Sequence, residues 1–188
     1  MKYDKMTMTY IILGILLLMA IYVISGFNKL VTFRNRMKEA WSSIDVYLKK
    51  RHDLVPNLIE TVKGYAAHEQ QTFEEVIRQR SQAMQATNQS VRIGSESEFG
   101  KALGRLMAIS ENYPVLKANV NFLELQRQLS ELEEELSLSR RYYNGTVREL
   151  NIAIERFPSN IMAGLFSFEK GVFFEIDKAE KKVPNVSF

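Results

Sequence analysis

Residues 6–28 form an apolar stretch without a charged side chain. A helix needs about 20 apolar residues to cross the hydrocarbon core of a bilayer, so this stretch is long enough to span one. Tyr10, Tyr22 and Phe27 lie toward its ends, where aromatic rings favour the headgroup region. The pattern predicts a transmembrane helix over residues 6–28, preceded by a short N-terminal tail over residues 1–5.

A cleaved secretory signal is the alternative interpretation of this stretch. Its apolar core would be shorter, about 7–15 residues, and a small-residue cleavage site would follow it. Ser25 and Gly26 are small, but Ile24 and Phe27 flank them and no A-x-A pattern occurs. The length and the flanks therefore favour a retained, single-pass anchor.

Basic residues flank the apolar stretch unequally. The N-terminal side has Lys2 and Lys5 beside Asp4, whereas the other side has Lys29, Arg34, Arg36 and Lys38. Lys and Arg close to a span tend to stay in the cytoplasm. We therefore expect a bacterial plasma (inner) membrane protein whose large domain is cytoplasmic. The opposite orientation, with the domain outside, stays open because the difference in charge is modest.

The rest of the chain repeats apolar residues at steps of three and four. One stripe runs from Phe122 to Phe157, about five heptads, and ends before Pro158. Another runs from Leu30 to Tyr47, with no helix breaker between it and the apolar stretch. Heptad stripes of this kind are typical of coiled-coil packing. They predict an all-α fold: an elongated antiparallel bundle of about four long helices over residues 29–165, continuing from the transmembrane helix.

Helix-breaking and capping residues divide the first half of this domain. Pro56 is expected to kink or restart the first helix, with Asp53 as its N-cap. A further helix is expected over about 70–90. Its predicted inward side chains are Phe73, Val76, Ile77 and Met84.

The second half begins with a polar segment. Residues 88–98 are polar and contain a glycine, which predicts a loop. Ser97 is then expected to cap a shorter helix that ends before Pro114. Residues 166–188 are less regular and rich in phenylalanine, and we expect them to pack on the bundle as a C-terminal tail.

Composition excludes several classes of function. The chain has 25 Lys and Arg against 22 Asp and Glu, a net charge of only +3, which argues against a nucleic-acid-binding protein. It has no cysteine, and therefore no disulfide, thiolate metal site or cysteine nucleophile. His52 and His68 lack a second histidine at metal-ligand spacing, and the Glu-x-x-His pairs of di-iron bundles are absent. We expect no catalytic, cofactor or metal site, no small-molecule substrate and no enzymatic activity.

The basic residues after the span suggest contact with lipid. Each Lys or Arg near an anionic membrane surface contributes about 1 kcal/mol to binding. The alternative is that these residues only set topology and solvate one helix face, and both interpretations can hold together. Lys49 to Arg51 lie too far along the helix for easy lipid contact, and we interpret that cluster as solvated. The expected headgroup contacts are Lys29, Arg34, Arg36 and Lys38.

Two arginines fall near the inward stripes of their helices. A buried arginine must find a carboxylate, so Arg51 and Arg80 predict structural ion pairs. Glu60, Glu75 or an acid from another helix could supply the partner. Such a pair would fix helix register more than it would add stability.

Several distinctive motifs follow one another along the chain after the apolar stretch. They are RNRMKEAW at 34–41, IDV at 44–46, RHDLVPNL at 51–58, VKGY at 62–65, ENYP at 111–114, LKAN at 116–119, NFL at 121–123, RRYYN at 140–144, FPSN at 157–160 and PNVSF at 184–188. In this order they resemble the LemA family of bacterial membrane proteins. Residues 82–100 match the family poorly.

The resemblance implies one N-terminal span and a helical domain, and it brings no catalytic residues. It also implies a role in the cell envelope, since relatives in magnetosome-forming bacteria help to build membrane compartments and family genes often accompany a membrane metalloprotease. The leading hypothesis is a scaffold acting through protein contacts, as a homo-oligomer or with other membrane proteins. The alternative is a membrane-remodelling or anionic-lipid-binding protein, and an accessory of a membrane protease is a further one.

Overall fold

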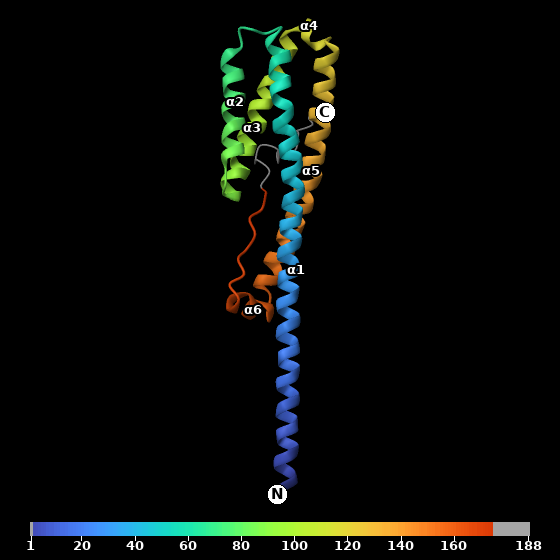
Figure 1. Cartoon of the computed structure of the whole chain (residues 1–188), viewed down its shortest axis with the longest axis vertical. Helices are drawn as coiled ribbons and strands as arrows, with labels where there is room; N and C mark the ends of the chain where they lie inside the picture. Colours follow the sequence, from blue (N-terminus) through green and yellow to red (C-terminus); the bar gives the residue numbers. More distant parts are fainter. Residues whose placement is uncertain (1, 175–188) are drawn as a thin grey trace, which may run out of the picture. The chain divides into compact units, whose positions relative to one another are not determined.

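A computed structural model describes residues 2–174 of the chain, and every regular element in that range is helical. The all-α fold class is therefore confirmed. Four of the helices are longer than a few turns: α1 (Lys2–Lys63), α2 (Gln70–Gln85), α3 (Gln89–Ile109) and α5 (Val120–Glu155). The short elements are a 3-10 turn (Ser110–Asn112), α4 (Pro114–Lys117) and α6 (Ser159–Leu165), labelled with the others in Figure 1.

Helix α1 runs without interruption through the apolar stretch and on to Lys63. The expected restart at Pro56 is therefore wrong, because this proline lies inside the helix. Asp53 is not a cap either: its carboxylate lies 2.5 Å from Lys49 Nζ, one turn earlier on the helix. Proline removes only one backbone hydrogen bond, and the buried residues on either side, Val55 and Leu58, keep the helix packed across the defect.

The loop expected over residues 88–98 is also wrong. Helix α3 begins at Gln89, and its N-cap is Asn88, whose Oδ1 accepts hydrogen bonds from the amides of Ser90 at 2.8 Å and Val91 at 3.4 Å. Ser97, expected as the cap, lies inside α3. The sequence misled here because the buried face of this helix includes a carboxylate, Glu96, which makes the segment look polar.

Helix α2 turns a different face inward from the one expected. Phe73 and Val76 are buried as predicted, but Ile77 and Met84 are 48% and 55% exposed, so their inward placement is wrong. Ala83 is buried on the same face as Phe73 and Val76, because positions separated by whole numbers of turns share one side of a helix. The remaining buried position of α2 is Gln79.

Prolines mark the ends of the later helices. Helix α3 ends at Ile109, before Pro114 as predicted, and Pro114 occupies the first turn of α4. The backbone amide of Phe122 donates to Asn119 Oδ1 at 3.0 Å, which satisfies one free amide at the start of α5. Helix α5 ends at Glu155, and its buried residues are Phe122, Leu129, Leu136, Tyr143, Thr146, Val147 and Leu150.

The chain divides into two compact units. Of the described residues, unit 1 contains 2–41 and 143–171, and unit 2 contains 42–142 and 172–174. Helices α1 and α5 each contribute residues to both units.

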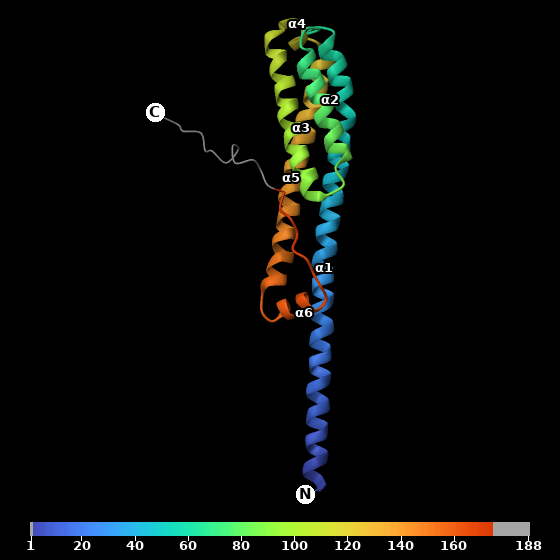
Figure 2. The same cartoon turned by 90° about the vertical axis from the view of Figure 1, so that its left-hand side faces the viewer.

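Each unit has its own core. In unit 2, α2 and α3 lie side by side in Figures 1 and 2, and their apolar residues share one cluster with residues of α1, α4 and α5. The core of unit 1 includes a cluster of Leu30, Met162 and Ala163, packed against Val23, Phe27, Ala153, Ile154 and Phe168. Of the expected aromatic tail, Phe168 belongs to this core and Phe174 is buried in unit 2, while residues 175–188 lie outside the described range.

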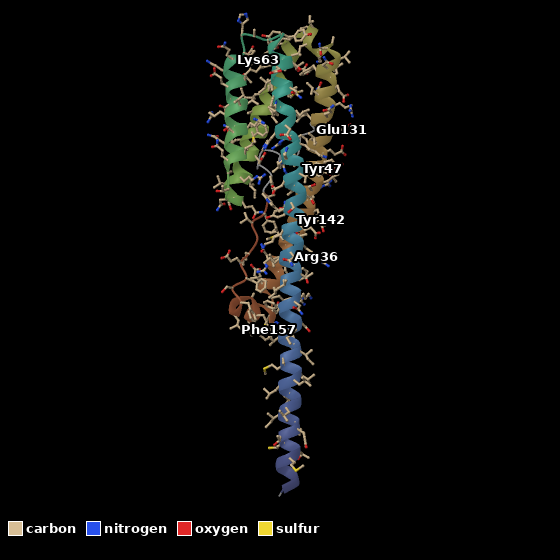
Figure 3. All side chains as sticks on the ribbon, in the orientation of Figure 1. Arg36, Tyr47, Lys63, Glu131, Tyr142 and Phe157 are labelled. Carbon is tan, nitrogen blue, oxygen red and sulfur yellow. The ribbon has the colours of Figure 1, made fainter. Side chains whose placement is uncertain are left out.

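Most of the apolar part of α1 is exposed. Apart from Val23, which packs on the core of unit 1, the side chains from residue 6 to residue 24 project freely from the helix in Figure 3. The most apolar 18-residue window has a mean hydropathy of 2.5 and no buried residue. Among the described residues, α1 is the one helix long and apolar enough to cross a membrane.

Candidate functional site

A cluster of ionisable side chains lies in unit 2, which we call the charge cluster. It consists of the buried Arg51 and His52 from α1, the buried Glu96 from α3 and the partly exposed Glu133 from α5. Arg51 is only 1% exposed, so the expectation that the segment from Lys49 to Arg51 is solvated is wrong for its last residue. Helix α1 places Arg51 inward because it lies seven residues, two turns, after the buried Ile44.

Arg51 joins the three helices of the charge cluster. Its Nη2 donates to Glu96 Oε2 at 2.5 Å, and its Nη1 donates to Glu133 Oε1 at 2.7 Å. Its guanidinium also lies over the ring of Phe99, 5.1 Å from the ring centre, which adds a cation–π contact. A guanidinium has the fixed, forked geometry that suits two carboxylates at once.

His52 completes the surroundings of Glu96. Its Nε2 lies 3.1 Å and 3.4 Å from the two carboxylate oxygens of Glu96, and its ring meets that of Phe99 edge-on at 5.1 Å. Burial of the Glu96 carboxyl raises its pKa. The His52 hydrogen bond and the Arg51 charge outweigh that effect, so the pKa of Glu96 lies below its usual value. Glu96 is therefore held as a buried carboxylate.

Arg80 has a different partner from the one its position suggested. Its Nε donates to the backbone carbonyl oxygen of His52 at 2.8 Å. That carbonyl lies four residues before Pro56, so in an ordinary helix it would accept the amide proton that proline lacks. Arg80 thus supplies from α2 the hydrogen bond that Pro56 removes from α1. This interaction, together with the packing of Val55 and Leu58, supports the continuation of α1 past Pro56.

Neither Glu60 nor Glu75 pairs with Arg51, whose partners are acids from two other helices, Glu96 and Glu133. The sequence did carry a signal for Glu96, since it lies three residues after Ile93 and three before Phe99 on one helical face. A carboxylate within an apolar stripe implies a buried cation elsewhere. Glu133 lies in a run of acidic residues with Glu131, Glu134 and Glu135, a composition typical of a solvent-facing surface, so the sequence did not mark it as a partner of Arg51.

The charge cluster is suited to specifying structure. Arg51, His52 and Glu96 are buried in the helical core, and a buried ion pair favours the one helix register in which both partners meet. Among the described residues, His, Asp and Glu form no group of three or more that could hold a metal ion.

An open groove lies next to the charge cluster in unit 2. It runs between α1 and α5, and the labelled residues Tyr47 and Glu131 in Figure 3 lie along it. A hydrogen bond with Glu135 raises the pKa of Tyr47, because ionised phenol and carboxylate repel one another. A hydrogen bond from Lys49 holds the pKa of Asp53 below its usual value.

The four basic residues expected to contact lipid all lie exposed on α1 in unit 1. Lys29 lies over the ring of Phe33 at 5.8 Å, and the guanidinium of Arg34 lies over the ring of Phe168 at 5.0 Å. Arg36 and Lys29 also line a groove between α1 and the end of α5. Lys38 is exposed two residues further along α1.

Together these features define an all-helical protein with an exposed apolar N-terminal helix and a helical core stabilised by buried charges. The sequence profile of the LemA family matches residues 40–188, so the chain belongs to the LemA family. This confirms the resemblance found in the sequence motifs.

Three curated relatives are similar at low identity. Magnetosome protein MamQ 2 of Paramagnetospirillum magneticum is 25% identical over 175 residues, which cover 79% of this chain and 64% of that protein. Magnetosome protein MamQ of Magnetospirillum gryphiswaldense is 24% identical, with the same coverage. Protein LemA of Metamycoplasma hominis is 24% identical over 155 residues, 82% of this chain and 71% of that protein. The chain thus spans slightly under two thirds of the length of its MamQ relatives.

Proposed function

We propose that this protein is a membrane-anchored helical scaffold of the bacterial cell envelope that acts through protein–protein contacts. In this proposal α1 crosses the plasma membrane once, and the helical units face the cytoplasm. The exposed apolar part of α1 supports the anchor, since water is a poor environment for a helix that is apolar on every side. The basic residues that follow it support the cytoplasmic orientation.

The observation that carries the scaffold role is a set of exposed apolar side chains at one end of unit 2. Val115 on α4 is 71% exposed and Val120 at the start of α5 is 78% exposed. Tyr65 belongs to the same end, because its hydroxyl accepts a hydrogen bond from Asn119 Nδ2 at 2.8 Å. Neighbouring exposed apolar residues are typical of protein interaction sites. We call these three residues the end patch.

Site-specific crosslinking in native membranes tests this role. A photo-reactive amino acid replaces Val115 or Val120, and the matched control replaces Glu98, an exposed polar residue of α3 in the same unit. We expect adducts from the end patch and few from Glu98. A band at twice the monomer mass would identify a homo-oligomer, and mass spectrometry of other bands would identify membrane partners, a membrane protease included. Monomer alone at every position would contradict the scaffold role.

The same end patch can report orientation. The chain has no cysteine, so Val120→Cys introduces a unique thiol. We expect an impermeant thiol reagent to label it only after the cells are opened. Labelling in intact cells would place unit 2 outside the cytoplasm.

Anionic-lipid binding is the second candidate function. It is favoured by four exposed cations that follow the apolar part of α1: Lys29, Arg34, Arg36 and Lys38. Each contributes about 1 kcal/mol near an anionic surface. Replacing Arg34, Arg36 and Lys38 by Gln should weaken the enrichment of phosphatidylglycerol around the protein in mixed vesicles, and added salt should weaken it in the unmodified protein. Equal enrichment in both proteins at low salt would exclude this function.

A further inference from the structure

Helix α6 packs on the part of α1 where the apolar stretch gives way to charge. Met162 and Ala163 of α6 are buried in the core of unit 1 together with Leu30, and Val23 and Phe27 pack against them. The rings of Phe27 and Phe166 meet edge-on at 4.8 Å, and this contact fixes the end of α6 to the same turn of α1. The short helix is therefore attached to α1 at residues 23–30.

This attachment sets the depth of α6 relative to a membrane. An α-helix rises 1.5 Å per residue, so the exposed apolar part of α1 from residue 6 to residue 24 is roughly 28 Å long. The hydrocarbon core of a bilayer is about 30 Å thick, so residues 23–30 would lie at its boundary with the headgroups. Anything packed on these turns lies at nearly the same depth.

The opposite side of this element is apolar and uncovered. Phe157, in the turn before α6, is 75% exposed, and Ile161 and Leu165 on α6 are 61% and 72% exposed. Figure 3 shows Phe157 at the level where α6 meets α1. We call these three residues the α6 patch.

Cations surround an apolar groove beside the α6 patch. The groove lies between α1 and the end of α5, and Phe157 lines it. Its apolar walls include Tyr22, Phe33 and Ile152. Its charged residues are Lys29, Arg36, Arg156 and Glu149, three cations and one carboxylate. Apolar and aromatic side chains next to an excess of basic groups complement a lipid leaflet, in which acyl chains lie beside anionic headgroups.

We propose that the α6 patch is a second membrane-contact element, which inserts Phe157, Ile161 and Leu165 into the leaflet that α1 enters. The occupant of the patch is lipid: acyl chains around the three apolar side chains, and phosphate headgroups beside Lys29, Arg36 and Arg156. This inference rests on the membrane anchor of the proposed function. It adds that unit 1 is held against the bilayer surface at two points, α1 and α6.

Spin labels on single cysteines test the proposal in the full chain, because the native chain has no cysteine. Ile161→Cys and Leu165→Cys carry the label in the α6 patch. Leu17→Cys, in the exposed apolar part of α1, is the control for lipid. Arg148→Cys is the control for water, since it is exposed on α5 about 13 Å along the helix from Phe157. Each variant is placed in nanodiscs of phosphatidylcholine and phosphatidylglycerol, and its collision rates with oxygen and with a water-soluble nickel chelate are measured.

The expected result is that both α6 labels have a higher oxygen-to-nickel ratio than Arg148→Cys, shifted toward the value at Leu17→Cys. A ratio equal to that at Arg148→Cys would place the patch in water and overturn the proposal. Low collision rates with both reagents would show that protein covers the patch, such as a second copy of the chain, and would also overturn it. A water-like ratio at Leu17→Cys would instead remove the membrane anchor, so the two proposals fail in distinguishable ways.

Discussion

We predict that the hydrogen bond from Arg80 to the carbonyl of His52 stabilises the protein mainly because residue 56 is a proline. Arg80 is useful to α1 only because proline leaves that carbonyl without its normal helical donor. The perturbations are Arg80→Met, which keeps the apolar length of the side chain but removes the donor, and Pro56→Ala, which restores the missing backbone amide. The two substitutions are studied singly and together.

The size of the effect follows from the geometry of the contact. Arg80 Nε lies 2.8 Å from the oxygen and carries charge, and hydrogen bonds to charged groups contribute about 1.5–3 kcal/mol. We therefore expect Arg80→Met alone to lower the free energy of unfolding by about 2 kcal/mol. In the Pro56→Ala background the backbone amide restored at residue 56 donates to the carbonyl oxygen of His52. The stability lost through Arg80→Met should therefore be smaller there than in the native background, by at least about 1 kcal/mol.

Urea unfolding of the full chain in detergent micelles, followed by circular dichroism, measures these differences. The free energy of unfolding typically falls by about 1–3 kcal/mol per molar urea, so Arg80→Met should lower the urea concentration at the unfolding midpoint by about 1 M. Arg78→Met is the matched control, because Arg78 is on the same helix and its contact with Glu75 is exposed. Exposed pairs contribute only about 0–1 kcal/mol. An equal loss for Arg80→Met with and without Pro56 would refute the reasoning.

Three further predictions concern unit 2. Glu96→Gln should lower the free energy of unfolding of the full chain by about 3 kcal/mol, because it removes the buried carboxylate that neutralises Arg51. The control Lys49→Gln removes an exposed ion pair and should lower it by less than about 1 kcal/mol. Equal urea midpoints for the two variants would contradict this prediction. The pKa of Glu96 is lower in the folded than in the unfolded chain, so its contribution to stability is present above the unfolded pKa of about 4.3 and is lost as pH falls through the folded pKa. Urea midpoints measured from pH 7 downward should show this loss in the native chain and a smaller one in Glu96→Gln. Asn88→Ala should cost about 1 kcal/mol by removing the N-cap of α3, and a thermal melt indistinguishable from that of the native chain would exclude the cap.

The sequence predicted the features that depend on apolar periodicity. Continuous apolar spacing from residue 6 to Tyr47, without a breaker, predicted the part of α1 that precedes Pro56 as one helix, and the stripe from Phe122 onward predicted α5. Such patterns are informative because each position reports the same property, burial on one face. The family resemblance was equally visible, because its motifs are spread along the chain.

The features that depend on contacts between distant residues could not be predicted. Nothing local shows that Arg80 donates to the carbonyl that Pro56 leaves free, so the proline appeared to end the first helix. Glu96 is buried because Arg51 and His52 face it from another helix, and without them its segment has the composition of a loop. Ile77 appeared to share the buried face of Phe73 and Val76, but the face of α2 that enters the core passes through Ala83 and leaves Ile77 exposed.

The division of the chain into units has a consequence for the order in which the protein is made. Unit 1 is built from two segments, residues 2–41 and 143–171, and the ribosome must synthesise about 100 residues of unit 2 between them. If these residues were a flexible loop, the part of the loop-closure entropy that grows with loop length would cost about 4 kcal/mol. Trp41 and Tyr143, the residues on either side of this insertion, meet edge-on with ring centres 5.3 Å apart. A unit 2 that folds first removes most of this entropic cost, so unit 1 would close late. Substitutions that delay unit 2, such as Glu96→Gln, would then leave Phe27 and Leu30 uncovered in the newly made chain and expose it to membrane quality-control proteases.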